Sequence, residues 1–259
     1  MIRVIGIDPG TKSFDICGIE EEDGQIKVFL DTSIPSEDLA KDPYIIIDLI
    51  KKNNPIELIV GPSGYGVELK HISKLSELDR KLMLLVRKED IGIPVLKGLR
   101  KIINFMEKEK LNVYFIPGVI HLPTVPYYRK INKIDMGTAD KLCCAILGIY
   151  DQAKHLNISY SDTCFILLEI GYAYNACIGV KNGKVIDGIG GTNSSISFKS
   201  LGGIDGELAY LLGKFEKMLL FSGGISELID SDDPRDIIKN EEAKEGFFEG
   251  LEKMVCSMM

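Results

Sequence analysis

One pattern of short strand-like runs occurs twice in this chain, and it limits the folds that the chain can adopt. The two sets of runs cover 2–8, 14–20, 26–31 and then 164–170, 174–180, 185–189. Each set has the alternation and spacing of an antiparallel three-stranded meander, and each comes before helix-like segments. The copies share little residue identity, so the repeat is architectural, and it predicts an α/β chain with two related halves.

The chain is long enough for two modest domains. It has 259 residues, of which 45% are hydrophobic, so each half can bury a core of its own. We place the boundary before Asp135, which can cap a helix running from about 137 to 155. The predicted domains are residues 1–134 and 135–259.

The charge balance argues against a partner bound through a phosphate backbone. Lys and Arg number 31 and Asp and Glu number 38, which gives a formal net charge of −7. The excess is concentrated between Glu227 and Glu249, where nine acidic residues stand against three basic ones. Proteins that neutralise nucleic-acid phosphates need a basic surface, so we expect no nucleic-acid partner.

Targeting and metal-binding signals are weak in this sequence. We find no signal-peptide pattern at MIRVIGID and no apolar run near ~20 residues, which predicts a cytoplasmic protein without a membrane partner. The six cysteines form no C-x-x-C pair and lie mostly in apolar runs, so we expect buried, reduced thiols. The three histidines lie far apart, which disfavours a zinc site.

The turn after the first strand carries the strongest chemical signal. It reads Asp8-Pro9-Gly10-Thr11-Lys12-Ser13. Gly10 can take a positive φ and lets the backbone approach a ligand, while Thr11, Lys12 and Ser13 offer donors to phosphate oxygens. Asp8, at the strand end, is placed to hold a hydrated Mg²⁺. An ordinary hairpin turn is the alternative, because Asp-Pro-Gly is common in turns.

The second meander has an acid and a glycine at the equivalent corner, Glu169 and Gly171. Asp8 and Glu169 could then face each other across a cleft and share a metal ion. Further glycine-rich turns follow, and Asp205 can cap a helix expected at 205–214. The candidate anion-binding residues in this region are Gly190, Gly191, Thr192, Gly202, Gly203 and Asp205. Turn flexibility explains these glycines equally well, and a solvated strand end explains Glu169.

The order of these segments resembles the acetate and sugar kinase, heat-shock chaperone and actin superfamily. GIDPGTKS at 6–13 looks like its first phosphate loop, and EIGYAYNACIGVKNGKVIDG at 169–188 looks like its second. Residues 178–212 resemble the acyl kinases, which include acetate and butyrate kinase. DMGTADKL at 135–142 and FSGG at 221–224 are similar to an uncharacterised archaeal butyrate kinase-like family.

The resemblance implies two ribonuclease H-like domains that bind ATP and Mg²⁺ in the cleft between them. It implies that Asp8 holds Mg²⁺ through water and that the first turn contacts the phosphates. Asp135 and Asp140 are then candidates for a catalytic base or a carboxylate that orients the substrate. Helix capping by Asp135, and a first-turn acid that stabilises the helix dipole at Asp140, are the alternatives.

Three features depart from the family pattern. The stretch 198–201 has no arginine where acyl kinases carry a catalytic one, and Lys199 does not replace a planar guanidinium. Ala173 stands where the second phosphate loop usually has a glycine. Residues 219–227 look like the adenosine loop of the superfamily, but they follow Asp205 more closely than that loop usually does. We therefore favour the alternative that residues 240–257 form the helix that precedes the adenosine loop. The loop itself would then be absent and the second domain incomplete.

Three classes of function follow from these features. We favour an ATP-dependent phosphotransferase, that is, a small-molecule kinase. If the chain is similar to the acyl kinases in activity, its acceptor is a carboxylate. The alternatives are a non-catalytic nucleotide-binding regulator or subunit and, with less support, a resolvase-like nuclease. The expected partner is a small-molecule acceptor, and a homodimer is an open alternative for the assembly.

Overall fold

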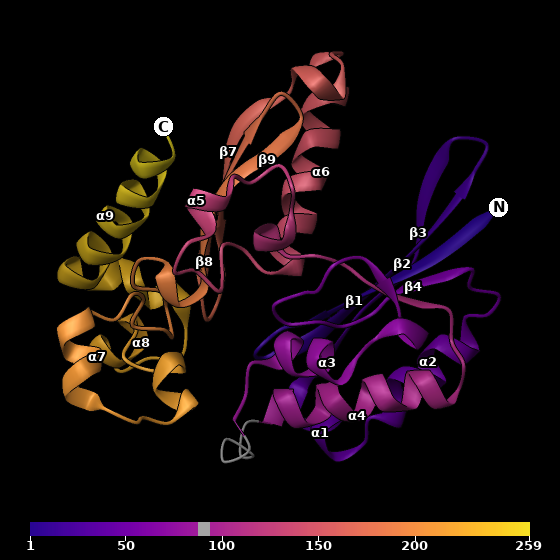
Figure 1. Cartoon of the computed structure of the whole chain (residues 1–259), viewed down its shortest axis with the longest axis horizontal. Helices are drawn as coiled ribbons and strands as arrows, with labels where there is room; N and C mark the ends of the chain where they lie inside the picture. The colour runs from indigo at the N-terminus through magenta and orange to yellow at the C-terminus, as the bar shows by residue number, and fades with distance from the viewer. Residues whose placement is uncertain (88–93) are drawn as a thin grey trace. The chain divides into compact units, whose positions relative to one another are not determined.

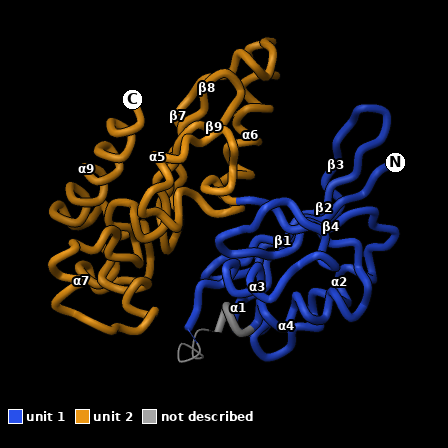
Figure 2. The backbone as a smooth tube through the Cα atoms, in the orientation of Figure 1, with its two compact units in different colours: residues 1–117 blue, residues 118–259 orange. Residues whose placement is uncertain are grey.

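The computed structural model describes residues 1–87 and 94–259, which divide into two compact units, 1–117 and 118–259 (Figure 2). Each unit has a sheet and a hydrophobic core of its own. Among the described residues, none of the helices combines the length and the apolar character that crossing a bilayer requires.

Unit 1 contains a six-stranded mixed sheet with helices packed on it (Figure 1). Its elements are β1 (Ile2–Pro9), β2 (Ser13–Glu22), β3 (Gln25–Pro35), α1 (Ser36–Lys41), α2 (Tyr44–Lys52), β4 (Leu58–Val60), β5 (Lys70–His71), the 3₁₀ helix η1 (Ile72–Lys74), α3 (Glu77–Leu84), α4 (Pro94–Lys108) and β6 (Val113–Phe115). The strand order is β3-β2-β1-β4-β6-β5, with β1, β4 and β6 parallel to one another.

The predicted N-terminal meander is confirmed. β1 and β2 pair antiparallel in a register that places Asp8 opposite Asp15, and β2 continues into β3 through Asp23 and Gly24. These two residues have φ angles of 51° and 77°, as a two-residue type I′ turn requires. One face of α4, which includes Leu99, is buried in the unit 1 core.

Unit 2 contains a three-stranded antiparallel sheet, β7-β8-β9. Its elements are η2 (Val119–His121), α5 (Tyr127–Lys130), α6 (Ala139–Leu156), η3 (Tyr160–Asp162), β7 (Cys164–Ile170), β8 (Asn175–Lys181), β9 (Lys184–Gly190), η4 (Gly191–Asn193), α7 (Gly206–Leu212), η5 (Lys217–Phe221), α8 (Ile225–Leu228), η6 (Pro234–Lys239) and α9 (Glu241–Met258). The Asn182-Gly183 hairpin turn joins β8 and β9, with φ angles of 53° and 68°.

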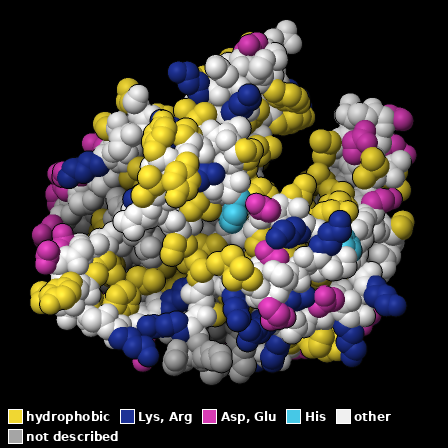
Figure 3. Space-filling model, viewed as in Figure 1, with side chains coloured by type: hydrophobic (Ala, Val, Ile, Leu, Met, Phe, Trp, Pro, Cys, Tyr) yellow, Lys and Arg dark blue, Asp and Glu magenta, His cyan; other side chains and the backbone are white. Residues whose placement is uncertain are grey.

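A helix covers each face of this sheet (Figure 1). Ile178 of β8 belongs to the hydrophobic cluster with α6, whereas the neighbouring Cys177 belongs to the cluster with α9. Successive side chains of a strand point to opposite faces, so β8 is buried on both sides. The exposed acids of α9 lie on the outside, where Figure 3 shows acidic side chains along this margin of unit 2.

The outer edge of β7 has no strand partner within the described residues. At the start of that edge, α6 supplies a substitute. The Gln152 side chain accepts a hydrogen bond from Cys164 N at 2.9 Å and donates one to Cys164 O at 3.5 Å. A side-chain amide therefore takes the place that a neighbouring strand would have at Cys164.

Two features differ from the expectations. The boundary between the units in the sequence lies between 117 and 118 rather than after 134. Residues after Pro117 form hydrogen bonds within unit 2: Thr124 Oγ1 donates to Val185 O at 2.6 Å. The prediction of buried thiols is wrong for five of the six cysteines, since only Cys177 is buried; all six lie within the described residues, and none of them forms a disulfide. Apolar neighbours in sequence do not bury a side chain that points outward from its helix or strand.

Candidate functional site

The first turn is built around a close backbone approach at Gly10. A Cβ on Gly10 would lie 2.7 Å from the carbonyl oxygen of Ser13, nearer than real Cβ atoms come to such an atom. Gly10 does not use the positive φ that a glycine can take. Glycine is required here because there is no space for a side chain.

The start of α1 fixes this turn. Ser36 N donates to Lys12 O at 3.1 Å, and Ser36 Oγ donates to Gly10 O at 3.1 Å. Thr11 and Lys12 are exposed, so their side chains are accessible at the tip. The turn therefore combines a fixed backbone with an accessible hydroxyl and cation, a combination suited to binding an anion.

The second turn repeats the construction of the first. It lies between β7 and β8, and a Cβ on Gly171 would lie 2.3 Å from Tyr174 O. Gly171 N donates to the same oxygen at 3.1 Å. In both turns an acid stands two residues before the glycine, and the carbonyl three residues after the glycine fills the space of a side chain. The two predicted phosphate turns thus share one backbone arrangement.

A cluster of charged side chains lies behind the second turn, and sequence reasoning missed its central residue. Lys141 Nζ lies 2.7 Å from Glu169 Oε1 and 3.0 Å from Asp140 Oδ2. Asp140 also accepts a hydrogen bond from Thr138 Oγ1. Lys141 belongs to the first turn of α6, where the helix dipole disfavours a cation, and this was the signal that could have identified it.

Burial and charge act on the protonation of this cluster. Burial of Glu169 raises the pKa of its carboxyl group, and the Lys141 charge opposes that shift. Burial lowers the pKa of Lys141, but Asp140 and Glu169 outweigh this effect and the net shift is upward. The lysine therefore stays charged at neutral pH. Glu169 Oε2 is buried and has no hydrogen-bond partner within the described residues.

Asp135 lies against the glycine turn that follows β9. Its Oδ1 accepts a hydrogen bond from Gly137 N at 2.8 Å. A Cβ on Gly191, whose φ is 57°, would lie 2.1 Å from Asp135 Oδ2, so the carboxylate occupies that space. Burial raises the pKa of Asp135 to about 6, with a smaller upward contribution from Asp140. A carboxyl group with a pKa near neutrality can accept and return a proton.

The expectation that Asp135 caps the helix is wrong. The N-cap of α6 is Thr138, and the helix begins at Ala139. The Asp135 carboxylate is instead bonded to Gly137, which has a φ of 121° and breaks the chain direction before the helix. Asp140 does lie in the first turn of α6, as predicted. Asp135, Asp140 and Glu169 lie close enough for Asp140 to act on the charge state of the other two.

The remaining predicted glycines and their cap lie in the segment after β9. Thr192 belongs to η4, and Gly202 has a φ of 83° and no room for a Cβ beside Ser195. Gly203 N donates to Ser194 O at 3.0 Å. Asp205 caps α7 as predicted, accepting from Glu207 N at 2.8 Å. These residues shape the loop, and no contact among them identifies an anion site.

The segment resembling an adenosine loop packs against the stretch that lacks the arginine. Ile225 N donates to Ser197 O at 3.0 Å and Ser226 N to Phe198 O at 2.8 Å. The glycine before them, Gly224, has no room for a Cβ, which would lie 2.4 Å from the Lys199 carbonyl carbon. The helix expected at 240–257 is confirmed as α9.

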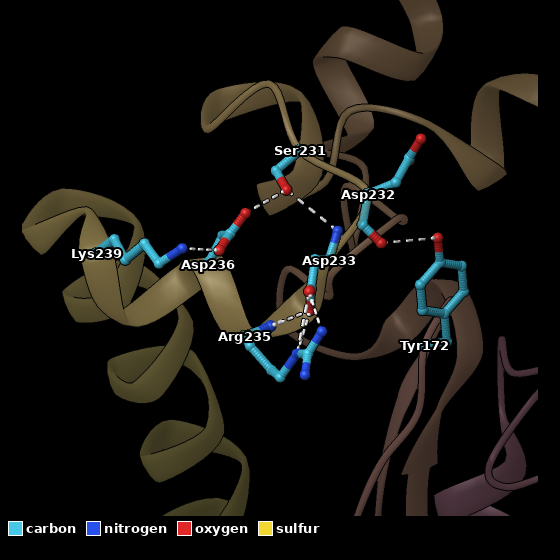
Figure 4. A network of polar contacts seen from close by, with 7 residues as sticks. All are labelled: Tyr172, Ser231, Asp232, Asp233, Arg235, Asp236 and Lys239. Atoms are coloured by element: carbon cyan, nitrogen blue, oxygen red, sulfur yellow. Dashed lines mark hydrogen bonds and ion pairs between the residues drawn. The ribbon is translucent and has the colours of Figure 1, made fainter.

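Lys199, at the position of the missing arginine, is held by an acid-rich loop. Its Nζ pairs with Asp232, and it lies 5.8 Å from the Tyr172 ring centroid. Figure 4 shows Tyr172, from the second turn, reaching the same loop, where its hydroxyl donates to Asp232 O at 3.5 Å. Within the loop, Ser231 Oγ donates to Asp236 at 2.7 Å, and Asp233 accepts from Arg235. Lys199 therefore ties this loop to the second turn.

Solved structures that share this fold include an acetate kinase and a propionate kinase. The chain resembles acetate kinase from Entamoeba histolytica, with 17% identity and a TM-score of 0.62 over 99% of this chain and 78% of that one. It also resembles a propionate kinase from Francisella tularensis, with 16% identity and a TM-score of 0.63 over 100% and 80% of the two chains. The predicted two-domain α/β fold is confirmed.

A family model gives the membership of the chain. The search of curated proteins found no match. The model that matches, over residues 6–259, carries the description "Protein of unknown function (DUF1464)". The match includes both turns and the charged cluster. By its sequence the chain is thus a member of the DUF1464 family, with the fold of the acetate and propionate kinases.

Proposed function

We propose that the chain is an ATP-dependent phosphotransferase and that each of its two turns binds phosphate oxygens of the nucleotide. The observation that carries this proposal is the shared construction of the turns at Gly10 and Gly171 in a chain with an acyl kinase fold. A glycine under a fixed carbonyl leaves the backbone exposed to a ligand on the other side. Phosphoryl transfer depends mainly on such positioning and on charge neutralisation.

The end of β1 offers carboxylates to a magnesium ion. Asp8 and Asp15 are direct cross-strand partners, so their side chains lie on the same face of the sheet. Carboxylate oxygens and water are the ligands that Mg²⁺ prefers, and this pair fits it. Bound there, the ion would neutralise the charge of the transferring phosphoryl group. Thr11, Lys12 and Ser13 then donate to phosphate oxygens.

Asp135 is the residue that we assign to the acceptor. Its carboxyl group lies against Gly190 and Gly191, and its pKa of about 6 suits a group that accepts a proton from an acceptor or orients it. A carboxylic acid is the acceptor we propose, in keeping with a butyrate kinase-like activity. Gly202, Gly203 and Asp205 shape the loop beside it.

Calorimetric titration of ATP with Mg²⁺ tests the binding step. We expect micromolar affinity that EDTA abolishes and that Asp8→Asn weakens at least tenfold, since one cation ligand is lost. Asp48→Asn, an exposed acid on α2, is the matched control and leaves the affinity unchanged. An Asp8→Asn chain that is folded and binds Mg-ATP as tightly as wild type would remove Asp8 from the site.

A non-catalytic nucleotide-binding subunit is the second candidate. The ion pair between Lys199 and Asp232 supports it, because this lysine stands where acyl kinases carry a catalytic arginine and is held by a carboxylate. A panel of short carboxylic acids with ATP separates the two functions through ADP release. Turnover that Asp135→Asn abolishes supports the kinase. Tight binding of ATP with no turnover on the panel supports the non-catalytic subunit.

A further inference from the structure

The charges behind the second turn are already balanced by a lysine. The ammonium of Lys141 bridges Asp140 and Glu169, and the three side chains are only 17%, 25% and 22% exposed. Both distances, 3.0 and 2.7 Å, are those of charge-assisted hydrogen bonds. Asp140 Oδ2 and Glu169 Oε1 are therefore engaged by a cation of the chain itself, and the other Glu169 oxygen, Oε2, is buried.

The turn leaves this ammonium close to the backbone. A Cβ at Gly171 would lie 3.5 Å from Lys141 Nζ and 3.5 Å from Glu169 Oε1. A larger side chain at this position would cover both groups. The glycine thus keeps the bridged charges next to the turn, where a ligand of the backbone amides would also lie.

A magnesium ion and this lysine compete for the same oxygens. Mg²⁺ requires oxygen ligands at about 2.0–2.1 Å in near-octahedral geometry, and it gives up its own water reluctantly. To bind Glu169 through Oε1 it would have to break the ion pair and leave the partly buried Lys141 charge with Asp140 alone, which is costly, and Oε2 is itself buried. Glu169 as placed therefore does not fit a direct metal ligand.

We propose that Lys141 takes the place of a divalent cation at the second turn and that its ammonium binds the phosphate oxygens of the nucleotide there. This inference rests on the proposed function. Asp140 and Glu169 are positioning residues that hold the ammonium beside Gly171. The ligand class is a polyphosphate, and the only metal then required is the one assigned to the first turn.

Manganese binding without nucleotide tests the replacement of the metal. Mn²⁺ is titrated into the full chain and followed by electron paramagnetic resonance, in wild type, Glu169→Gln, Lys141→Met and the double variant. We expect Glu169→Gln to bind as many Mn²⁺ ions as wild type. We expect Lys141→Met to gain one Mn²⁺ site, because the carboxylates of Asp140 and Glu169 lose the ammonium that pairs with them. The double variant should lose that site again.

The opposite result overturns the proposal. If Glu169→Gln alone removes a Mn²⁺ site that wild type has, Glu169 is a metal ligand and Lys141 is not its substitute. This comparison needs no Lys141 variant, and the change from carboxylate to amide conserves shape, so it remains decisive if Lys141→Met fails to fold. The same conclusion follows if folded Lys141→Met gains no site.

Nucleotide affinity tests the second half of the proposal. With ATP in excess Mg²⁺, we expect Lys141→Met to weaken binding about tenfold, the effect of one charged hydrogen bond. Lys154→Met, an exposed lysine on the same helix, is the matched control. Unchanged ATP affinity in a folded Lys141→Met chain would overturn this assignment. If the wild-type chain binds no ATP, the proposed function fails, and the proposed binding of phosphate by Lys141 fails with it. The Mn²⁺ titrations still show whether Lys141 or a metal ion pairs with Glu169 at the second turn.

Discussion

The two turns have the same backbone arrangement but obtain their positive charge from different places. In unit 1 the cation is Lys12, which lies within the turn and is exposed at its tip. In unit 2 the cation is Lys141, which comes from the first turn of α6 and lies behind the turn in contact with two carboxylates. A repeated backbone can therefore carry two kinds of charge, one exposed on the turn itself and one paired with carboxylates beside it.

The hairpins that follow the two turns give the largest expected difference in stability. Gly24 and Gly183 both have positive φ, but a Cβ on Gly24 meets nothing within 4 Å, whereas one on Gly183 lies 2.2 Å from Tyr160 O. We expect Gly24→Ala to cost about 1 kcal/mol from backbone strain alone and Gly183→Ala about 3 kcal/mol, since a clash is added. Urea unfolding of both variants measures the difference, and equal losses would show that Tyr160 yields easily.

The next prediction tests whether the two turns are built alike. Gly10→Ala and Gly171→Ala should each lower the unfolding free energy by about 2–3 kcal/mol, because a backbone carbonyl occupies the place of the new methyl group. Gly6→Ala in β1, where a Cβ meets nothing within 4 Å, is the control and should cost less than 1 kcal/mol. Thermal and urea unfolding are the measurements. If only one turn is sensitive, the two arrangements are not equivalent.

Lys141 and Lys12 should differ in their effect on stability. Lys141→Met leaves Asp140 and Glu169 half-buried without their cation, which we expect to cost about 2 kcal/mol at neutral pH. The pKa of Glu169 then rises further, so the loss shrinks as the pH falls and the carboxyl is protonated. Lys12→Met changes an exposed side chain and should cost less than about 0.5 kcal/mol. Unfolding curves at acid and neutral pH compare the two. A loss for Lys141→Met that does not change with pH would contradict the account.

The smallest effect is expected at Asp135. Its pKa is about 6 in the folded chain and lower in the unfolded chain, so protonation favours folding. This contribution is complete below about pH 4 and is lost as the pH rises through about 6. Asp135→Asn should therefore add about 1 kcal/mol at pH 8 and nothing near pH 4. Urea unfolding at the two pH values measures this, with Asp151→Asn as the exposed control on α6. A stabilisation of equal size at both values would exclude titration as the cause.

The contrast between the turns also explains what the sequence could predict. Strand periodicity with Asp23-Gly24 and Asn182-Gly183 at the bends is enough for both meanders, because these signals are local. The first turn could be proposed as a site for the same reason, since Asp8, Gly10 and Lys12 are neighbours in sequence. Lys141 lies far from Gly171 along the chain, and only the packing of α6 on β7 brings them together. Local spacing could not show that contact.

Packing also explains the features for which the structure differs from the sequence-based prediction. Asp135 has the right residue type for a helix cap, but Gly137 turns the chain and the cap passes to Thr138. The Asp135 carboxylate lies where a side chain of residue 191 would be. The sequence shows that residue 191 is a glycine, but it does not show that Asp135 lies beside it. The boundary between the units follows from hydrogen bonds such as that of Thr124 to Val185, which no composition change marks.

The Gln152 amide on the edge of β7 has a consequence for the behaviour of the chain at high concentration. An unpaired strand edge recruits the edges of other chains and starts β-aggregation. Gln152 holds both the N–H and the C=O of Cys164, so an incoming strand finds that end of β7 already satisfied. At its first residue β7 therefore offers an incoming strand no unbonded backbone pair, although the sheet has no further strand on that side within the described residues.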